Sequence, residues 1–297
     1  MRRLVTALSI MLLALATPAT AQQVTLDAVK VGDTTVVHSL RLRDGSTIVG
    51  RIVSVTADSV RVELRAGNLS LARTDVTEVH ESSRSRMRNG VYWFDNPHAT
   101  RLLFSPTAFP LEQGTGYFSD IYLFLAGAQW GITNRFSLGG GLSLFPTSNF
   151  SDNMFYLTPK VTVVDAPQLK MSLGGFLGWV GAAADEGESG SLGLLYGVAS
   201  TGTRDNNLSL GLGWGYYGGN IADIPVIMLG GQRRISRRMS LISENWFVHD
   251  AGDTNGAISY GLRFLGERMS VDLAFINALG KDMIFPGVPF VGFAVKF

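Results

Sequence analysis

The sequence predicts an all-β protein: an antiparallel transmembrane β-barrel of about 12 strands, preceded by a small β-barrel module. Three observations support this prediction. Residues 97–297 repeat segments in which apolar side chains alternate with glycine, serine or alanine. Mean hydropathy is positive, at +0.19, yet beyond the N-terminus no run of about 18 apolar residues could form a membrane-spanning helix. The connections between the segments are alternately short and long.

Residues 1–21 have the three-part order of a secretory signal peptide. Arg2 and Arg3 precede the apolar residues 4–16, and the small residues Ala19-Thr20-Ala21 follow. This order predicts cleavage after Ala21, and the shortness of the apolar run disfavours the alternative of an uncleaved anchor helix. The chain contains no cysteine, so the exported protein must be stabilised by sheet closure and packing instead of disulfides.

Residues 33–81 predict several short strands joined by tight turns. Asp44-Gly45 is a hairpin signal, and residues 57–59 and 67–68 mark two more turns. Isoleucine, valine and leucine residues between the turns favour strands. Four or five strands in about 45 residues suit a small closed barrel, because closure removes exposed edges.

The stretch "LRDGSTIVGRIVSVTADSVRVEL" within this region resembles SH3-like and Sm-like small barrels. The resemblance implies a fold and an interaction or spacer role, with a periplasmic protein or a cell-wall component as partner. Nucleic-acid binding, a common role of Sm-like proteins, is disfavoured by export and by a net charge of +1.

Residues 82–96 predict a linker with two open interpretations. Arg84, Arg86 and Arg88 alternate with other residues, and Tyr92-Trp93-Phe94 follows. The segment is either a solvated linker or a tether that places arginines near anionic headgroups and aromatic rings at the membrane boundary.

From Arg101 onward, each repeated segment has one large apolar face and one small face. "NLSLGLGWGYY" places Leu208, Leu210 and Leu212 against Ser209 and Gly211. A soluble β-sandwich also alternates, but its outer face would carry more charged residues. The segments also approach the 9 to 11 residues that cross a bilayer at a tilt.

The connections alternate in length along the chain. Short ones fall at residues 133–134, 165–167, 204–207, 236–237 and 266–267, and longer ones at 110–115, 146–153, 183–190, 218–223, 250–255 and 280–287. Short turns at one end and longer loops at the other are typical of outer-membrane barrels. This count makes the residues before 110 the first barrel strand, and it places both barrel ends and the N-terminal module in the periplasm.

The final strand alternates Val291, Phe293, Val295 and Phe297 with smaller residues. It must pair with the first strand, because an open edge in lipid leaves backbone groups unsatisfied. This strand, with its terminal phenylalanine, resembles the C-terminal assembly signal of bacterial outer-membrane β-barrels. The resemblance covers residues 97–297 and implies an outer-membrane location, with lipid and the barrel-assembly machinery as partners.

Two segments resist simple assignment. Pro159 lies inside a predicted strand, where its missing N–H suggests a bulge. The stretch "YFSDIYLFLAGAQW", residues 117–130, is apolar on both faces, so its inward side cannot be assigned.

Alternation places six charged residues on the inner face of the barrel. They are Lys160, Lys170, Glu244, Arg263, Asp272 and Lys296. Mixed charge in a lumen either forms a salt-bridged plug or lines a narrow polar pore.

Signals for catalysis or for a metal are weak. His249 with Asp250 is the best candidate for a general base at the outer rim, but no serine motif accompanies it. Asp185, Glu186 and Glu188 could bind Ca²⁺, although their spacing does not fit an EF-hand loop. The glycines at 139–141 lie within a strand and leave space inside a tight barrel. We therefore expect no enzyme activity, no cofactor and no metal site.

Three functions remain open on the sequence. The first is an outer-membrane barrel of structural or narrow-channel type with a periplasmic interaction module. The second is a barrel enzyme acting on lipid or peptide at the extracellular rim. The third is a secreted soluble β protein that binds a ligand.

Overall fold

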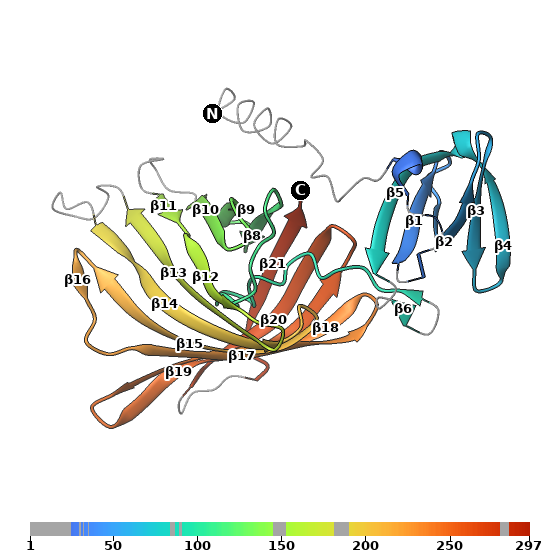
Figure 1. The fold of residues 1–297 in the computed structure, drawn as a ribbon. Helices are drawn as coiled ribbons and strands as arrows, with labels where there is room; N and C mark the ends of the chain where they lie inside the picture. Colours follow the sequence, from blue (N-terminus) through green and yellow to red (C-terminus); the bar gives the residue numbers. More distant parts are fainter. Residues whose placement is uncertain are drawn as a thin grey trace, which may run out of the picture. The chain divides into compact units, whose positions relative to one another are not determined.

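The computed structural model describes residues 25–29, 31, 33–34, 36–83, 87–88, 91–144, 153–180, 190–279 and 285–297. They fall into two compact units, one within Thr20–Phe94 and the other formed by Asp95–Phe297 (Figure 1). The predicted signal peptide lies outside the described residues. None of the described helices is long and apolar enough to cross a membrane.

The N-terminal unit is one antiparallel sheet of five strands in the order β4-β3-β2-β1-β5. The predicted turn at Asp44-Gly45 joins the first two strands, and Gly45 adopts a φ of +84° there. The elements of this unit are η1 (Leu26–Ala28), β1 (Val36–Leu42), β2 (Thr47–Val55), β3 (Ser59–Leu64), β4 (Gly67–Ala72), η2 (Arg73–Asp75) and β5 (Val76–Ser83), followed by the two-stranded ladder β6 (Met87–Arg88) and β7 (Val91–Tyr92).

This sheet is open, which corrects the prediction of a closed small barrel. The short turn η2 leads from β4 to β5, and no ladder joins these two edge strands in the described part of the unit. The sheet nevertheless changes partner along β2: residues 47–50 pair with β1 and residues 51–55 pair with β3. Leu71 of β4 and Val76 of β5 both pack against the core around Leu40 and Ile52.

His38 is a buried polar group in this apolar unit. Its Nδ1 accepts a hydrogen bond from the backbone N–H of Ile52 at 3.3 Å, and its Nε2 lies 4.0 Å from the Glu81 carboxylate. Burial lowers the pKa of His38 below its usual 6.5, although Glu81 and Asp33 oppose the shift. The folded unit therefore favours the neutral imidazole.

We predict that the N-terminal unit loses stability as the pH falls below about 6.5, because the unfolded chain then takes up a proton that folded His38 resists. The loss continues down to the lowered pKa of the folded state and then levels off. Hydrogen exchange of the β1 amides, corrected for intrinsic rates, measures this. In His38→Asn, whose side-chain oxygen can replace Nδ1 as acceptor, this pH dependence should flatten; an unchanged profile would assign it to another group.

The larger unit is a closed antiparallel barrel. Its sheet holds fourteen strands within the described residues. β16 only extends β15, and β11 and β12 occupy one position between β10 and β13, so twelve positions form the ring. β21 pairs with β8 and closes it. The strands are β8 (Gly116–Ile121), β9 (Leu125–Gly131), β10 (Phe136–Ser143), β11 (Met154–Leu157), β12 (Lys160–Asp165), β13 (Leu169–Val180), β14 (Gly190–Gly202), β15 (Asn206–Tyr217), β16 (Asn220–Ile221), β17 (Val226–Ser236), β18 (Met239–Asp250), β19 (Asp253–Leu265), β20 (Met269–Leu279) and β21 (Val288–Lys296).

The predicted strand number is confirmed, but the set of strands differs at the start. Residues 101–109, expected to be the first strand, form no barrel strand. Residues 117–130 instead form the hairpin of β8 and β9, with a turn at residues 122–124. Opposed residues such as Ile121 and Leu125 share a face, so odd-numbered residues face inward on both strands. The inward set includes the apolar side chains of Tyr117, Ile121 and Leu125, which explains why this stretch has no single apolar face.

Pro159 does not form the expected bulge. The register with β10 is the same before and after it, since Gly140 pairs with Leu157 and Ser137 with Lys160. The gap between β11 and β12 reflects only the missing N–H of proline. The register shift lies later, between Thr162 and Val164.

Large apolar side chains face outward and small ones face inward. On β15, Leu208, Leu210 and Leu212 are 56%, 54% and 45% exposed, whereas Ser209 is 5% exposed. The inward serines of the other strands are likewise buried. The alternation in the sequence therefore reports the two faces of the barrel wall.

Inward glycines make room for large side chains of neighbouring strands. A Cβ on Gly141 would overlap the backbone carbonyl oxygen of Ala126 and the Tyr156 hydroxyl. A Cβ on outward Gly197 would find Leu173 Cδ2 at 3.4 Å, an ordinary contact. The space inside the barrel thus depends on particular glycines.

We predict that Gly141→Ala lowers the yield of folded barrel, because the added methyl group must displace backbone. Gly197→Ala adds the same group to another strand and should fold normally. Electrophoresis with and without boiling separates folded from unfolded barrel. Equal folding of both variants would contradict the packing described for Gly141.

Candidate functional site

The lumen of the barrel is occupied by residues 95–115, which we call the lumenal loop. Leu102, Leu103, Thr107 and Ala108 are almost completely buried. Within the loop, Thr107 N–H donates to the Thr100 carbonyl and Leu102 N–H donates to the Ser105 carbonyl, so the chain turns back on itself. The loop brings irregular backbone into the barrel, and this backbone needs hydrogen-bond partners.

Glu244, at the middle of β18, binds the tip of the loop. Its carboxylate accepts hydrogen bonds from the backbone N–H groups of Leu103 at 2.8 Å, Phe104 at 2.9 Å and Ser105 at 2.9 Å. Trp246 Nε1 donates to the other carboxylate oxygen at 2.6 Å. This fully buried charge is therefore stabilised by donors aimed at it, most of them from the loop.

Arg263, on β19, binds carbonyl groups of the loop, whereas Glu244 binds N–H groups. It forms a two-point ion pair with Asp272 of β20, at 2.6 and 2.9 Å. Its remaining N–H groups donate to the carbonyl oxygens of His98 and Leu102, both at 2.7 Å, and to Gln232 Oε1 at 3.1 Å. The pairing with Asp272 offsets the free-energy cost of burying the guanidinium. The N–H groups that Asp272 does not occupy hold the loop carbonyls.

Lys160 of β12 is the third anchor. Its ammonium donates to the carbonyl oxygens of Phe109 at 2.9 Å, Thr107 at 3.1 Å and Thr100 at 3.4 Å. Three carbonyl acceptors match the three donors of an ammonium group. Lys160 thus ties the two arms of the loop together and to the wall.

The other two predicted lumenal charges lie away from these anchors. Lys170 pairs with Asp165 next to the turn between β12 and β13, and its ammonium lies 6.0 Å from the centre of the Phe109 ring. Lys296 is the last residue of β21, and its side chain is half-buried.

The base of the loop is fixed at the short-turn end by residues that the sequence analysis did not select. Arg204 donates to the Pro110 carbonyl at 2.9 Å and accepts, through its own carbonyl, a hydrogen bond from Asn96 Nδ2 at 3.1 Å. Nearby, Arg234 forms an ion pair with Asp205 at 3.0 Å. Both arms of the loop therefore leave the barrel at the same end.

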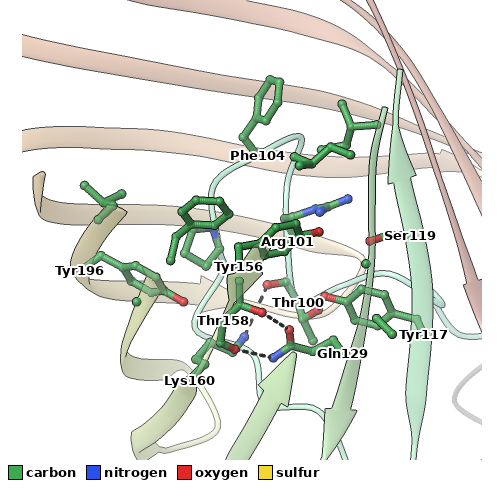
Figure 2. Close-up of a pocket in the computed structure, with 18 of the residues that line it drawn as sticks. Thr100, Arg101, Phe104, Tyr117, Ser119, Gln129, Tyr156, Thr158, Lys160 and Tyr196 are labelled. Atoms are coloured by element: carbon green, nitrogen blue, oxygen red, sulfur yellow. Dashed lines mark hydrogen bonds between the residues drawn. The ribbon is translucent and has the colours of Figure 1, made fainter. Parts of the chain in front are cut away.

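A cavity of about 350 Å³ lies between the loop and one side of the wall. Figure 2 shows Arg101 and Phe104 reaching it from the loop, while Tyr156 and Tyr196 reach it from the wall. Thr158 Oγ1 donates to Gln129 Oε1 at 2.8 Å at its edge. Its volume is within the range of small-molecule sites.

The candidate rim base, His249, lies exposed at the hairpin of β18 and β19, as does Asp250. Its Nδ1 and Thr254 Oγ1 are 3.0 Å apart. Asp185, Glu186 and Glu188 lie outside the described residues. Among the residues that are described, no group of three or more His, Asp or Glu side chains is placed to hold a metal ion.

The last strand lies where the sequence placed it. Val291, Phe293 and Val295 alternate with the buried inward residues of β21. Phe297 exchanges two backbone hydrogen bonds with Gly116, and its ring stacks on Trp130 at 5.7 Å.

One sequence signal could have revealed the lumenal loop. Pro97, Pro106 and Pro110 occur within fourteen residues, and central strands exclude proline because it cannot donate to the ladder. That density argues against a wall strand at residues 101–109.

Comparisons with known proteins give no family. No protein-family model matches the chain, and no curated protein matches it. Solved structures that match include OmpT, an outer membrane protein of Vibrio cholerae, in a form lacking loop L8: identity is 9%, the TM-score is 0.35, and 89% of this chain and 97% of that chain are covered. The in-vitro folded trimer form of OmpT has 9% identity and a TM-score of 0.34, with 89% and 96% covered. Likeness at this level carries no weight, and the barrel is established by its strand pairing alone.

We predict that Glu244→Gln loosens the tip of the loop, because hydrogen bonds to a charged acceptor are stronger than those to a neutral amide. The chain has no cysteine, so Ser105→Cys provides a single buried thiol at the tip. Adding Glu244→Gln should raise the rate of thiol labelling about tenfold or more.

Glu112→Gln is the matched control, because Glu112 is exposed at the base of the loop and contacts Arg204 at 3.6 Å. It should leave labelling of the thiol unchanged. A labelling rate insensitive to Glu244→Gln would contradict its role as the anchor of the tip.

Proposed function

We propose that this protein is an integral outer-membrane β-barrel of the narrow-channel or transport type whose lumen is closed by the lumenal loop. The observation that carries the proposal is the enclosure of residues 96–109, held to the wall by Lys160, Glu244 and Arg263. A purely structural barrel needs no such loop, because wall side chains alone can fill a lumen.

The outer surface supports a membrane location. Exposed leucine and aromatic side chains recur on strand after strand, from Trp130 on β9 to Leu273 on β20. An apolar surface of this extent in water would aggregate. Hydrocarbon chains are the environment that such a surface fits, which favours the membrane barrel over the secreted soluble protein.

The ends of the barrel support a periplasmic orientation for its short-turn end. Gly116 and Phe297 are hydrogen-bonded neighbours at that end, and bacterial barrels place short turns in the periplasm. In this orientation Phe297 lies at the periplasmic boundary, and we propose that residues 291–297 serve as the assembly signal read by the barrel-assembly machinery. The N-terminal unit is then periplasmic.

We further propose that the N-terminal unit is an SH3-like interaction module for a periplasmic protein or cell-wall component. Its support is the change of partner along β2 and the single apolar core that the strands share. In the adjoining segment, the Arg88 guanidinium lies 4.2 Å from the centre of the Trp93 ring. This pairing favours the tether interpretation of residues 82–96, because arginine and tryptophan both suit the membrane boundary.

We propose no reaction for the protein. The exposed His249 contacts Thr254, its partner across the hairpin, and neither residue lines the cavity beside the lumenal loop. Transport through a barrel requires only a route and a selective site.

We predict that shortening the loop opens the barrel. Because Thr100 and Thr107 are hydrogen-bonded to each other, Gly-Gly can replace residues 101–106 without straining the ends. The refolded wild-type protein should give rare current steps in a planar bilayer, and the shortened variant should give frequent, stable ones. A boiled and unboiled gel comparison confirms that both are folded.

His249→Ala is the control, and its currents should match those of the wild type. A folded but silent shortened variant would contradict the channel proposal and favour a structural role.

A further inference from the structure

The cavity beside the lumenal loop contains a cation that lacks a counter-ion. Arg101 lines the cavity, and its Nε is buried without a hydrogen-bond partner. Its guanidinium donates no hydrogen bond to any part of the chain that the structure describes. Arg101 is half-buried, and a guanidinium that lines a cavity without any acceptor favours an anion at this position.

Other charges around the cavity are already satisfied. The Glu244 carboxylate accepts hydrogen bonds from the loop N–H groups and from Trp246. Asp272 is paired with Arg263, and Lys160 donates to three loop carbonyls. Asp120 lies between the cavity-lining Ser119 and Ile121 and has one buried carboxylate oxygen without a hydrogen bond, but it forms no ion pair with Arg101. Within the described residues, Arg101 is therefore a cavity-lining cation without an ion-pair partner.

The remainder of the cavity is mainly apolar. Phe104, Phe176, Leu194 and Trp246 line it, together with the rings of Tyr156 and Tyr196. One cationic group beside an apolar chamber suits a ligand with one anionic head and one hydrocarbon chain. A carboxylate head matches the guanidinium through two parallel hydrogen bonds.

The wall is short where the cavity approaches the membrane. β8 and β9 have six and seven residues, whereas crossing strands need about 9 to 11. Their turn consists of Tyr122, Leu123 and Phe124, with Leu123 73% exposed and the first two residues at φ of +58° and +64°. An apolar turn on a short hairpin fits hydrocarbon better than water.

Ile121 and Leu125, the residues on either side of this turn, both line the cavity. The hairpin tip thus connects the cavity with the region that acyl chains would occupy. A ligand dissolved in the membrane could reach the cavity over this tip without first entering water.

We propose that the cavity binds a long-chain carboxylate, with its carboxylate on Arg101 and its chain among the aromatic side chains, and that this ligand arrives from the membrane over the hairpin tip. The proposal rests on the membrane barrel of the proposed function and names the substrate class of its lumen. Binding in detergent solution tests it separately from conductance, so that the two can fail independently.

The test measures equilibrium binding of radiolabelled palmitate to the full-length protein refolded in neutral detergent. Wild type should bind one palmitate per chain, and Arg101→Gln should bind at least tenfold more weakly. Arg135→Gln, which alters an exposed arginine in the turn between β9 and β10, should bind like the wild type. Equal binding by all three proteins, or no binding by the wild type, would overturn the proposal.

A second measurement does not depend on the folding of a variant. Hexadecanol has the same chain without the carboxylate, and it should bind the wild type at least tenfold more weakly than palmitate. Arg101→Lys should retain part of the preference for palmitate. Equal affinity of the wild type for the acid and the alcohol would overturn the role of Arg101.

The membrane route has its own test. Leu123→Asp, at the hairpin tip, should slow loading of palmitate from phospholipid vesicles several-fold while leaving its affinity in detergent unchanged. Loading at the wild-type rate would overturn the route but not the site.

Discussion

Backbone polar groups at membrane depth must all find partners, and this constraint governs both the wall and the contents of the barrel. The wall meets it by closing, since β21 and β8 leave no open edge. The lumenal loop cannot meet it through a ladder, because its backbone is irregular. Glu244 instead accepts from its N–H groups, while Arg263 and Lys160 donate to its carbonyls. The buried charges thus serve as substitutes for a neighbouring strand.

The same constraint explains the composition of the inner face. Serines and glycines dominate the part of the wall near the short turns, because the loop fills the space there. Ser172 and Ser200, for example, form hydrogen bonds with the backbone of Ala108. Aromatic side chains dominate beside the cavity, where the loop leaves a space against the wall. Tyr156 lies over Gly127 and Gly141, so large and small residues alternate between adjacent strands.

The sequence predicts the wall better than its contents, for a physical reason. Side chains of a wall strand alternate between its two faces, so the faces of Leu208 and Ser209 can be predicted without knowing which strand pairs with theirs. The positions of Glu244, Arg263 and Asp272 on the inner face follow from the same parity. The loop partners of Glu244 and Arg263 do not, because the loop atoms that they bind lie more than 130 positions away along the chain. The turn at residues 122–124 was missed because Tyr122 and Leu123 are residues that seldom adopt a positive φ. The open edge between β4 and β5 was missed because strand count does not specify closure.

The N-terminal unit ends at Phe94, and Asn96, two residues later, is already enclosed within the larger unit. The chain that leaves the N-terminal unit is therefore the chain that enters the lumen. A pull on the chain at residue 95 would act on the first arm of the lumenal loop. The bonds that it would meet first are those from Asn96 to the Arg204 carbonyl and from Arg263 to the His98 carbonyl. Withdrawal of the lumenal loop from this end therefore requires these hydrogen bonds to break before those of the loop tip.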